Sequence, residues 1–267
     1  MDVVRSADGT GIALFDLGGS GRPVILVHGA SADHTTWRVS GPILARGRRV
    51  IGLDRRGRGA SGDTQPYSIE REFDDLAAAA EELAGSGRGP VDVVGHSFGG
   101  RVALGAALRT EAIRRLVVYE SAPPVATDAY QPAGLVRRLR ELADSGDGDE
   151  LLSAFLLEVV GMSQGDLDAY RADPIWATRA AAAPTIVREL EAESAPAASL
   201  DALGGVRQPV LQVVGGQSRS AFQRATQALD LRLADGRVVT IPGARHGAHH
   251  THPETFVAAV EEHLGPS

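Results

Sequence analysis

Short, mainly apolar runs alternate with longer amphipathic segments along most of this chain. Six runs have the composition of buried strands: 24–27, 50–53, 91–94, 116–119, 210–214 and 237–241. Helical spacing and composition mark four segments between and after them: 69–83, 100–109, 221–231 and 254–264. Strands that are apolar on both sides belong to a parallel sheet covered on both faces. The alternation therefore predicts an α/β fold with a mostly parallel, doubly wound sheet and right-handed crossovers.

Two regions depart from this alternation. Residues 2–17 carry Asp8-Gly9-Thr10-Gly11 at their middle and predict an antiparallel hairpin. Residues 123–203 show no strand pattern, but they contain helix candidates at 133–143, 150–160, 167–172 and 175–193, the last with a break at Pro184. Roughly 80 residues are too many for a simple connection in a compact domain. We expect a helical cap, residues 123–203, inserted between the sixth and seventh strands of a core formed by residues 1–122 and 204–267.

The composition excludes several kinds of chemistry. The chain has no cysteine and no lysine, which excludes thiolate nucleophiles, Cys-ligated metal centres, Schiff-base lysines and Walker-type phosphate loops. Its formal net charge is −7, and the densest basic cluster, Arg55, Arg56 and Arg58, is too local for a nucleic-acid surface. No window approaches the ~18 apolar residues of a membrane span, and no signal-peptide core follows Met1. We expect a cytoplasmic protein without a nucleic-acid or membrane partner.

Gly95-His96-Ser97-Phe98-Gly99 directly follows one predicted strand and runs into a predicted helix. A turn this tight needs small residues two before and two after the serine, and it lifts the serine hydroxyl above the sheet in a strained conformation. The adjoining helix N-terminus suits a developing oxyanion. The alternative is that two glycines flank this serine by chance, in a chain with 32 glycines. The strand–turn–helix context favours Ser97 as a nucleophile.

Together with three further motifs, this turn makes the chain resemble the α/β-hydrolase superfamily over essentially its whole length. The three motifs are Val27-His28-Gly29-Ala30, similar to the oxyanion loop, the segment 54–61, similar to the next strand-end signature, and 243–247, similar to the catalytic-histidine loop. They occur in the order found in the family. The resemblance implies that the backbone N–H groups of Ala30 and Phe98 form the oxyanion hole, with Ser31 as an alternative or additional donor.

His246 is the candidate general base, because a serine hydroxyl needs an imidazole within hydrogen-bonding reach before it can attack. His249, His250 and His252 follow closely, and such a run is also compatible with a metal site. The chain has neither a cysteine ligand nor an H-E-x-x-H arrangement. We therefore expect one catalytic histidine, no metal and no cofactor.

The acid departs from the commonest pattern of the family, in which it follows the strand here at 210–214. Residues 215–229 contain no Asp or Glu, and Gln217 and Ser218 stand at that position. Glu120 ends the strand 116–119, at the sheet edge where catalytic side chains gather. Zearalenone-type lactonases and a subset of haloalkane dehalogenases have a Glu at a similar position. The alternative for Glu120 is an ordinary strand-end carboxylate or a salt bridge to the cap, and the lack of another acid favours the catalytic role.

A nucleophilic serine predicts acyl transfer to water, in which Ser97 attacks a carbonyl, His246 carries the proton and Glu120 holds the imidazole. Haloalkane dehalogenases and epoxide hydrolases of the superfamily use Asp instead, which argues against both. We expect a small, apolar carboxylic ester or lactone as substrate. A carbon–carbon bond hydrolase, a perhydrolase with the same triad, and a non-catalytic small-molecule receptor remain as alternatives.

Substrate selection depends on the cap, which is the least readable part of the sequence. The candidate pocket residues are Ser31, Phe155, Met162, Tyr170 and Trp176. Isolated apolar residues at helical spacing are more often part of a helical core than of a pocket. The sequence predicts no oligomeric state.

Overall fold

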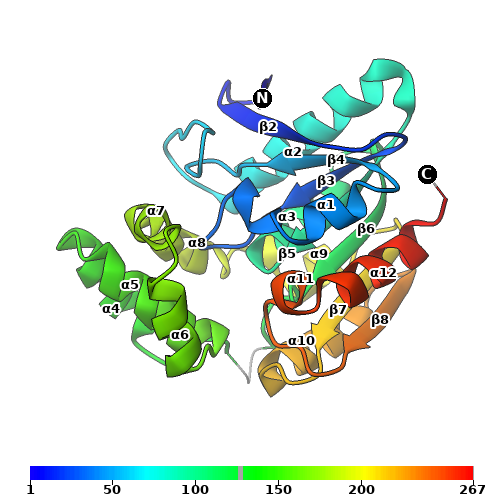
Figure 1. Cartoon of the computed structure of the whole chain (residues 1–267). Coiled ribbons are helices and arrows are strands. Elements are labelled where there is room, and N and C mark those ends of the chain that lie inside the picture. Colours follow the sequence, from blue (N-terminus) through cyan, green and yellow to red (C-terminus); the bar gives the residue numbers. More distant parts are fainter. Residues whose placement is uncertain (126–128, 267) are drawn as a thin grey trace.

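A single sheet forms the centre of the molecule (Figure 1). The computed structural model describes residues 1–125 and 129–266, and within them eight strands pair in the order β1-β2-β4-β3-β5-β6-β7-β8. The strands are β1 (Asp2–Arg5), β2 (Gly11–Gly18), β3 (Pro23–Val27), β4 (Arg49–Leu53), β5 (Val91–His96), β6 (Ile113–Tyr119), β7 (Val210–Gly215) and β8 (Gly236–Ile241). All pairs from β4 to β8 are parallel, whereas β1 and β2 form an antiparallel hairpin joined antiparallel to β4. The predicted mostly parallel sheet and N-terminal hairpin are confirmed.

Helices cover both faces of this sheet, because its central strands are apolar on both sides. In β3, Ile25 and Val27 pack in one hydrophobic core, and Val24 and Leu26 pack in the other. The first core includes side chains of α2 (Ile69–Leu83), α3 (Phe98–Ala107) and α10 (Ser220–Asp230), and the second those of α1 (Ser40–Leu44) and α12 (Pro253–Leu264). The part of the chain outside the cap has three further short helical segments: η1 (His34–Trp37), η2 (Ala84–Arg88) and α11 (Ala248–Thr251). The sheet is therefore doubly wound, as predicted.

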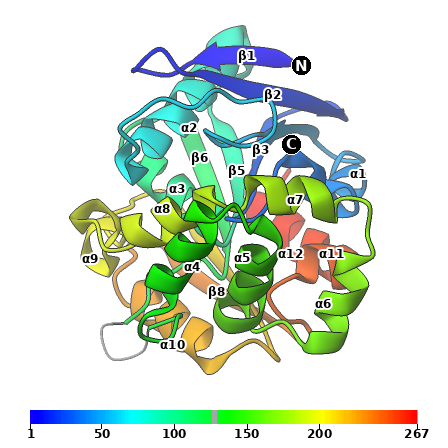
Figure 2. The same ribbon diagram turned by 90° about the vertical axis from the view of Figure 1, so that its left-hand side faces the viewer.

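The cap lies between β6 and β7 and forms a separate layer, which faces the viewer in Figure 2. Its helices are α4 (Leu135–Asp144), α5 (Gly148–Phe155) with its continuation η3 (Leu156–Val160), α6 (Gln164–Arg171), α7 (Trp176–Ala182) and α8 (Thr185–Ala192). The predicted break at Pro184 is present, since α7 ends before this residue and α8 begins after it. The last two helices before β7, η4 (Pro196–Ala198) and α9 (Leu200–Leu203), contact the core helices α2, α3 and α10.

Buried ion pairs connect the cap to the core. The guanidinium groups of Arg55 and Arg58 both contact Glu189 of α8, at 2.8 and 3.0 Å, and Arg101 of α3 contacts Glu193 at 2.8 Å. Arg56 is buried like Arg55 and Arg58, so the basic cluster noted in the sequence is not exposed. Pairs of this kind orient the elements that they join more than they stabilise them, because both charges lose their hydration. In the part of the chain that the structure describes, no helix is long and apolar enough to cross a membrane.

Candidate active site

Ser97 lies at the sharp turn between β5 and α3, with φ 53° and ψ −124°. This left-handed conformation is unfavourable for a residue with a side chain and is typical of functional turns. The flanking glycines are required by space. A Cβ at Gly95 would lie 2.4 Å from the Cα of Gly100, and a Cβ at Gly99 would lie 2.2 Å from the backbone oxygen of His28. The sequence motif thus forms the strained turn that was predicted from it.

His246, on the loop after β8, contacts the carboxylate of Glu120. The distance from His246 Nδ1 to Glu120 Oε2 is 2.6 Å, and the Glu120 side chain is fully buried. An ionised carboxylate only accepts hydrogen bonds, so Nδ1 of His246 donates in this contact, and in the neutral form of the ring Nε2 keeps its lone pair. The contact expected from the sequence between these two residues, which are 126 positions apart, is therefore present.

Glu120 is itself held firmly at the end of β6. Its backbone has φ 48°, so a second strained residue follows a strand end beside Ser97. Its second oxygen, Oε1, accepts hydrogen bonds from the backbone N–H of Gly215, at 2.8 Å, and from the hydroxyl of Ser218. Ser218 is one of the two residues at the position where the family more often has its acid. Its hydroxyl now serves to orient the carboxylate that lies on the neighbouring strand.

Two aromatic side chains hold the ring and the backbone of His246. Phe222 of α10 stacks on the His246 ring, with the centroids 4.9 Å apart and the planes at 21°. His96 Nε2 lies 2.8 Å from the backbone oxygen of His246, so this nitrogen carries the proton and donates. Burial keeps the pKa of His96 well below its usual value, and the ring is neutral. His96 was not singled out in the sequence, although its place beside Ser97 in the turn is a signal that would have found it.

The loop after β3 is oriented by a buried histidine. His28 Nε2 accepts a hydrogen bond from the backbone N–H of Arg55 at 3.0 Å, so Nδ1 carries the proton and donates to the carbonyl of Gly29 at 2.9 Å. Because a trans peptide directs its C=O and N–H to opposite sides, this bond points the N–H of Ala30 away from His28. Phe98 is the first residue of α3, so its N–H has no acceptor within the helix. Phe98 follows Ser97 in the chain, and Ala30 lines the same cavity as Ser97.

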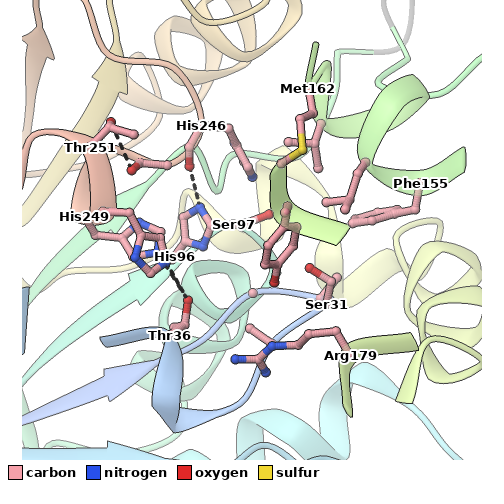
Figure 3. A pocket seen from close by; sticks show the side chains of 18 of the residues that line it. Ser31, Thr36, His96, Ser97, Phe155, Met162, Arg179, His246, His249 and Thr251 are labelled. Atoms are coloured by element: carbon pink, nitrogen blue, oxygen red, sulfur yellow. Dashed lines mark hydrogen bonds between the residues drawn. The ribbon is translucent and has the colours of Figure 1, made fainter. Parts of the chain in front are cut away.

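A cavity of about 480 Å³ opens at Ser97 and His246, between the core and the cap (Figure 3). We call it the large cavity. Of the predicted pocket residues, Ser31, Phe155, Met162 and Tyr170 line it. Trp176 lies behind Tyr170 in the cap, where the two rings meet edge to face and the indole N–H donates to Asp149. An indole with a polar partner inside the cap packs there instead of at the cavity wall.

The large cavity also has polar wall residues that the sequence did not indicate, among them Thr36, Arg179, His249 and His250. Figure 3 shows Thr36 and His249 on the side of Ser97 opposite to Phe155 and Met162. The Thr36 hydroxyl lies 3.1 Å from His250 Nε2 and 3.4 Å from His249 Nε2. Burial lowers the pKa of His250 to about 4 and holds that of His249 well below its usual value. Both rings are therefore uncharged at neutral pH.

The run of histidines does not gather ligand atoms for a metal in the described part of the chain. There, the side chains close enough to share an ion are Asp33, His34 and Asp54. Arg179 and the Thr35 hydroxyl contact Asp33, and His34 Nδ1 lies 2.8 Å from Asp54. These carboxylates already have partners of their own. Among the described residues, the only cluster of possible ligand atoms thus lies apart from the contact between His246 and Glu120.

Comparisons with known proteins agree with the fold. The chain matches the model of the Alpha/beta hydrolase family over residues 24–259. A solved structure of an alpha/beta hydrolase from Sphaerobacter thermophilus DSM 20745 is 30% identical, with a TM-score of 0.82, and the alignment covers 97% of this chain and 100% of that one.

Two curated relatives have named activities. A pimeloyl-[acyl-carrier protein] methyl ester esterase from Neisseria meningitidis serogroup A is 29% identical over 89% of this chain and 75% of that protein. A 2-hydroxy-6-oxo-6-(2'-aminophenyl)hexa-2,4-dienoic acid hydrolase from Metapseudomonas resinovorans is 31% identical over 48% of this chain, and the match spans 49% of that protein. The second resemblance therefore concerns about half the length of each chain.

Proposed function

Because the chain belongs to the alpha/beta hydrolase family, we propose that it is a serine hydrolase that cleaves a small carboxylic ester or lactone through an acyl-enzyme on Ser97. One observation carries the proposal: Ser97 at its strained turn and His246, held through Nδ1 by the buried carboxylate of Glu120, line the same cavity. Acyl transfer needs a nucleophile, a base that takes its proton and an acid that orients the base.

In the proposed reaction, Ser97 Oγ attacks the carbonyl carbon while His246 Nε2 takes the hydroxyl proton. The carbonyl oxygen becomes an oxyanion and accepts hydrogen bonds from the N–H groups of Ala30 and Phe98. The resulting imidazolium passes its proton to the departing alkoxide, which becomes an alcohol and, unless the substrate is a lactone, leaves. A water molecule then attacks the acyl carbon while His246 takes one of its protons. The bond to Ser97 Oγ breaks, the acyl group leaves as a carboxylic acid, and His246 returns the proton to Oγ. Glu120 stays ionised throughout and stabilises the imidazolium.

The walls of the large cavity support a small organic substrate with an apolar part. Phe155, Leu156, Val160 and Met162 supply an apolar side, whereas Thr36 and the neutral His250 supply hydrogen-bonding groups. A volume of about 480 Å³ lies within the range of small-molecule sites. The esterase among the relatives supports an ester as the substrate class.

A carbon–carbon bond hydrolase is the second candidate, because one relative is named as a dienoic acid hydrolase. That relative is matched over half its length, so the ester remains the preferred substrate class. The two candidates differ in the bond that is cleaved. A vinylogous diketone that is consumed faster than any ester would favour the second.

The test is turnover of p-nitrophenyl acetate together with labelling by a fluorophosphonate, followed by peptide mass spectrometry. We expect the label on Ser97, and we expect Ser97→Ala to lower kcat on the order of 10⁴-fold or more while the protein stays folded. A Ser97→Ala variant that keeps more than about a tenth of the wild-type rate would exclude this nucleophile. Binding of an ester without any turnover by the wild type would favour the receptor alternative.

A further inference from the structure

A second and much smaller space adjoins Ser97, on the side of α3 and α8. Its volume is about 20 Å³, and we call it the small cavity. Its own walls, which the large cavity does not share, include Phe98, Val159 and Leu190. Ala30, Ser97, Phe155, Val160 and His246 line both cavities. The nucleophile therefore lies at the boundary between a spacious compartment and a confined one.

The small cavity has room for a small group only. Its volume is about 20 Å³, against about 480 Å³ for the large cavity. Interiors are packed closely enough that a longer group meets side chains that must move, at a cost of about 1–3 kcal/mol. A substrate with two bulky ends does not fit across Ser97 without such movement.

Ion pairs fix the wall of the small cavity that comes from the cap. Glu189, which is one of its lining residues, is held by Arg55 and Arg58, and Glu193 one turn later is held by Arg101 of α3. Both contacts join α8 or the residue that follows it to the core. Moving this wall outward would separate buried opposite charges, which is costly. The confined size is therefore a property of the assembled cap and core.

The two ends of a bound ester must enter different cavities. With the carbonyl oxygen directed at the N–H groups of Ala30 and Phe98, the acyl chain and the alcohol of an open-chain ester extend from the carbonyl carbon in opposite directions. One end then faces the large cavity and the other the small cavity. A lactone cannot be divided in this way, because its ring joins the two ends.

The position of His246 indicates which end of the ester occupies which cavity. The base must return its proton to the leaving oxygen, so the alcohol lies along the loop that carries His246. That loop forms a wall of the large cavity through His246, Gly247 and His249, together with His250 and Thr251, whereas only His246 of this group reaches the small cavity. The alcohol thus occupies the large cavity.

We propose that the small cavity is the acyl site and that the substrates are esters of very short acids, acetyl or at most propionyl, with a larger alcohol. This inference rests on the proposed function, since it assumes an acyl group on Ser97. It narrows the substrate class from esters and lactones in general to open-chain esters with a short acyl end.

The first experiment keeps the leaving group constant and varies the acyl chain. The wild type is assayed with p-nitrophenyl acetate, propionate, butyrate and hexanoate, and kcat/KM is expected to fall at least about tenfold from acetate to hexanoate. A second pair keeps the total size constant: hexyl acetate and methyl heptanoate are isomers with the bulk on opposite sides. We expect hexyl acetate to be hydrolysed at least about tenfold faster.

The variants Leu190→Ala and Val159→Ala each enlarge the small cavity and leave the large one unchanged. Each is expected to raise the ratio of kcat/KM for butyrate over acetate by at least about tenfold. Met162→Ala is the matched control, because Met162 lines the large cavity alone. It should leave this ratio within about twofold. Should Leu190→Ala fail to fold by circular dichroism, Val159→Ala carries the same test with a smaller loss of packing.

Three results would overturn the inference: hexanoate turned over as well as acetate, methyl heptanoate preferred to hexyl acetate, or a small lactone preferred to both. Loss of these rates in Ser97→Ala would show that the proposed function still holds in such a case. Rates that do not depend on Ser97 would instead contradict the proposed function itself. The two failures are therefore distinguishable.

Discussion

Replacing Glu120 with Gln should remove most of the activity, and the contacts of Glu120 determine how. Its Oε1 accepts hydrogen bonds from the Gly215 N–H and the Ser218 hydroxyl, so the oxygen of the new amide is expected at that position. The amide NH₂ then faces His246 Nδ1, 2.6 Å from the Oε2 position in the wild type. Two N–H groups cannot face each other at this distance, so His246 is expected to shift its proton to Nε2.

A histidine in that tautomer has no lone pair toward Ser97 and cannot accept its proton. The charge that stabilises the imidazolium is lost as well, and no water can replace it, because the Glu120 side chain is fully buried. Both effects act on the transition state, so we expect kcat to fall about 10⁴-fold, equivalent to about 5 kcal/mol. KM should change much less than kcat, since Gln keeps the shape of the side chain that Glu120 contributes to the wall of the small cavity.

The assay compares kcat and KM for p-nitrophenyl acetate at pH 7.5, with thermal unfolding to show that the variant is folded. Gln217→Ala is the control, because it alters the other residue at the alternative acid position without touching Glu120, and it should stay within about threefold of the wild type. The reasoning is refuted if Glu120→Gln keeps more than a tenth of the wild-type kcat.

Two further predictions concern the histidines. His246→Ala should lower kcat as much as Ser97→Ala, because loss of any one member of a triad removes most of the contribution of the whole triad. His252→Ala should lower kcat less than about tenfold in the same ester assay. Equal losses in both histidine variants would contradict the assignment of the base. The second prediction concerns stability, since burial lowers the pKa of His250 to about 4 from its ordinary 6.5. The unfolded chain then binds more protons between these values, so the free energy of unfolding should rise by at most about 3 kcal/mol from pH 4 to pH 6.5 and level off above. Urea unfolding of wild type and His250→Gln measures this, and an equal pH slope in both proteins would count against it.

Structural features that depend on residues close together in the chain could be predicted from the sequence. The strands of the parallel sheet need apolar residues on both sides, and this pattern is visible in a run such as Val24–Val27. The turn at Ser97 requires small residues at Gly95 and Gly99 for local steric reasons, so its motif and its geometry coincide. The expected contact between Glu120 and His246 followed from elimination combined with the rule that side chains at the carboxyl ends of parallel strands meet at one edge.

Features that depend on how distant helices pack were decided by the tertiary structure. The sequence by itself determined the sheet, the insertion of a cap and the candidates for nucleophile, base and acid, because each follows from local pattern and strand order. It did not show that Ser218 would orient Glu120, that Arg179 and His250 would line the large cavity, or that Trp176 would lie behind Tyr170. The positions of Arg179 and Trp176 depend on which faces of the cap helices meet the core, whereas the contact of Ser218 with Glu120 depends on how the loops after β6 and β7 meet at the sheet edge. Several orientations satisfy the same amphipathic pattern, and only the sum of close packing and the buried ion pairs of α8 selects one of them.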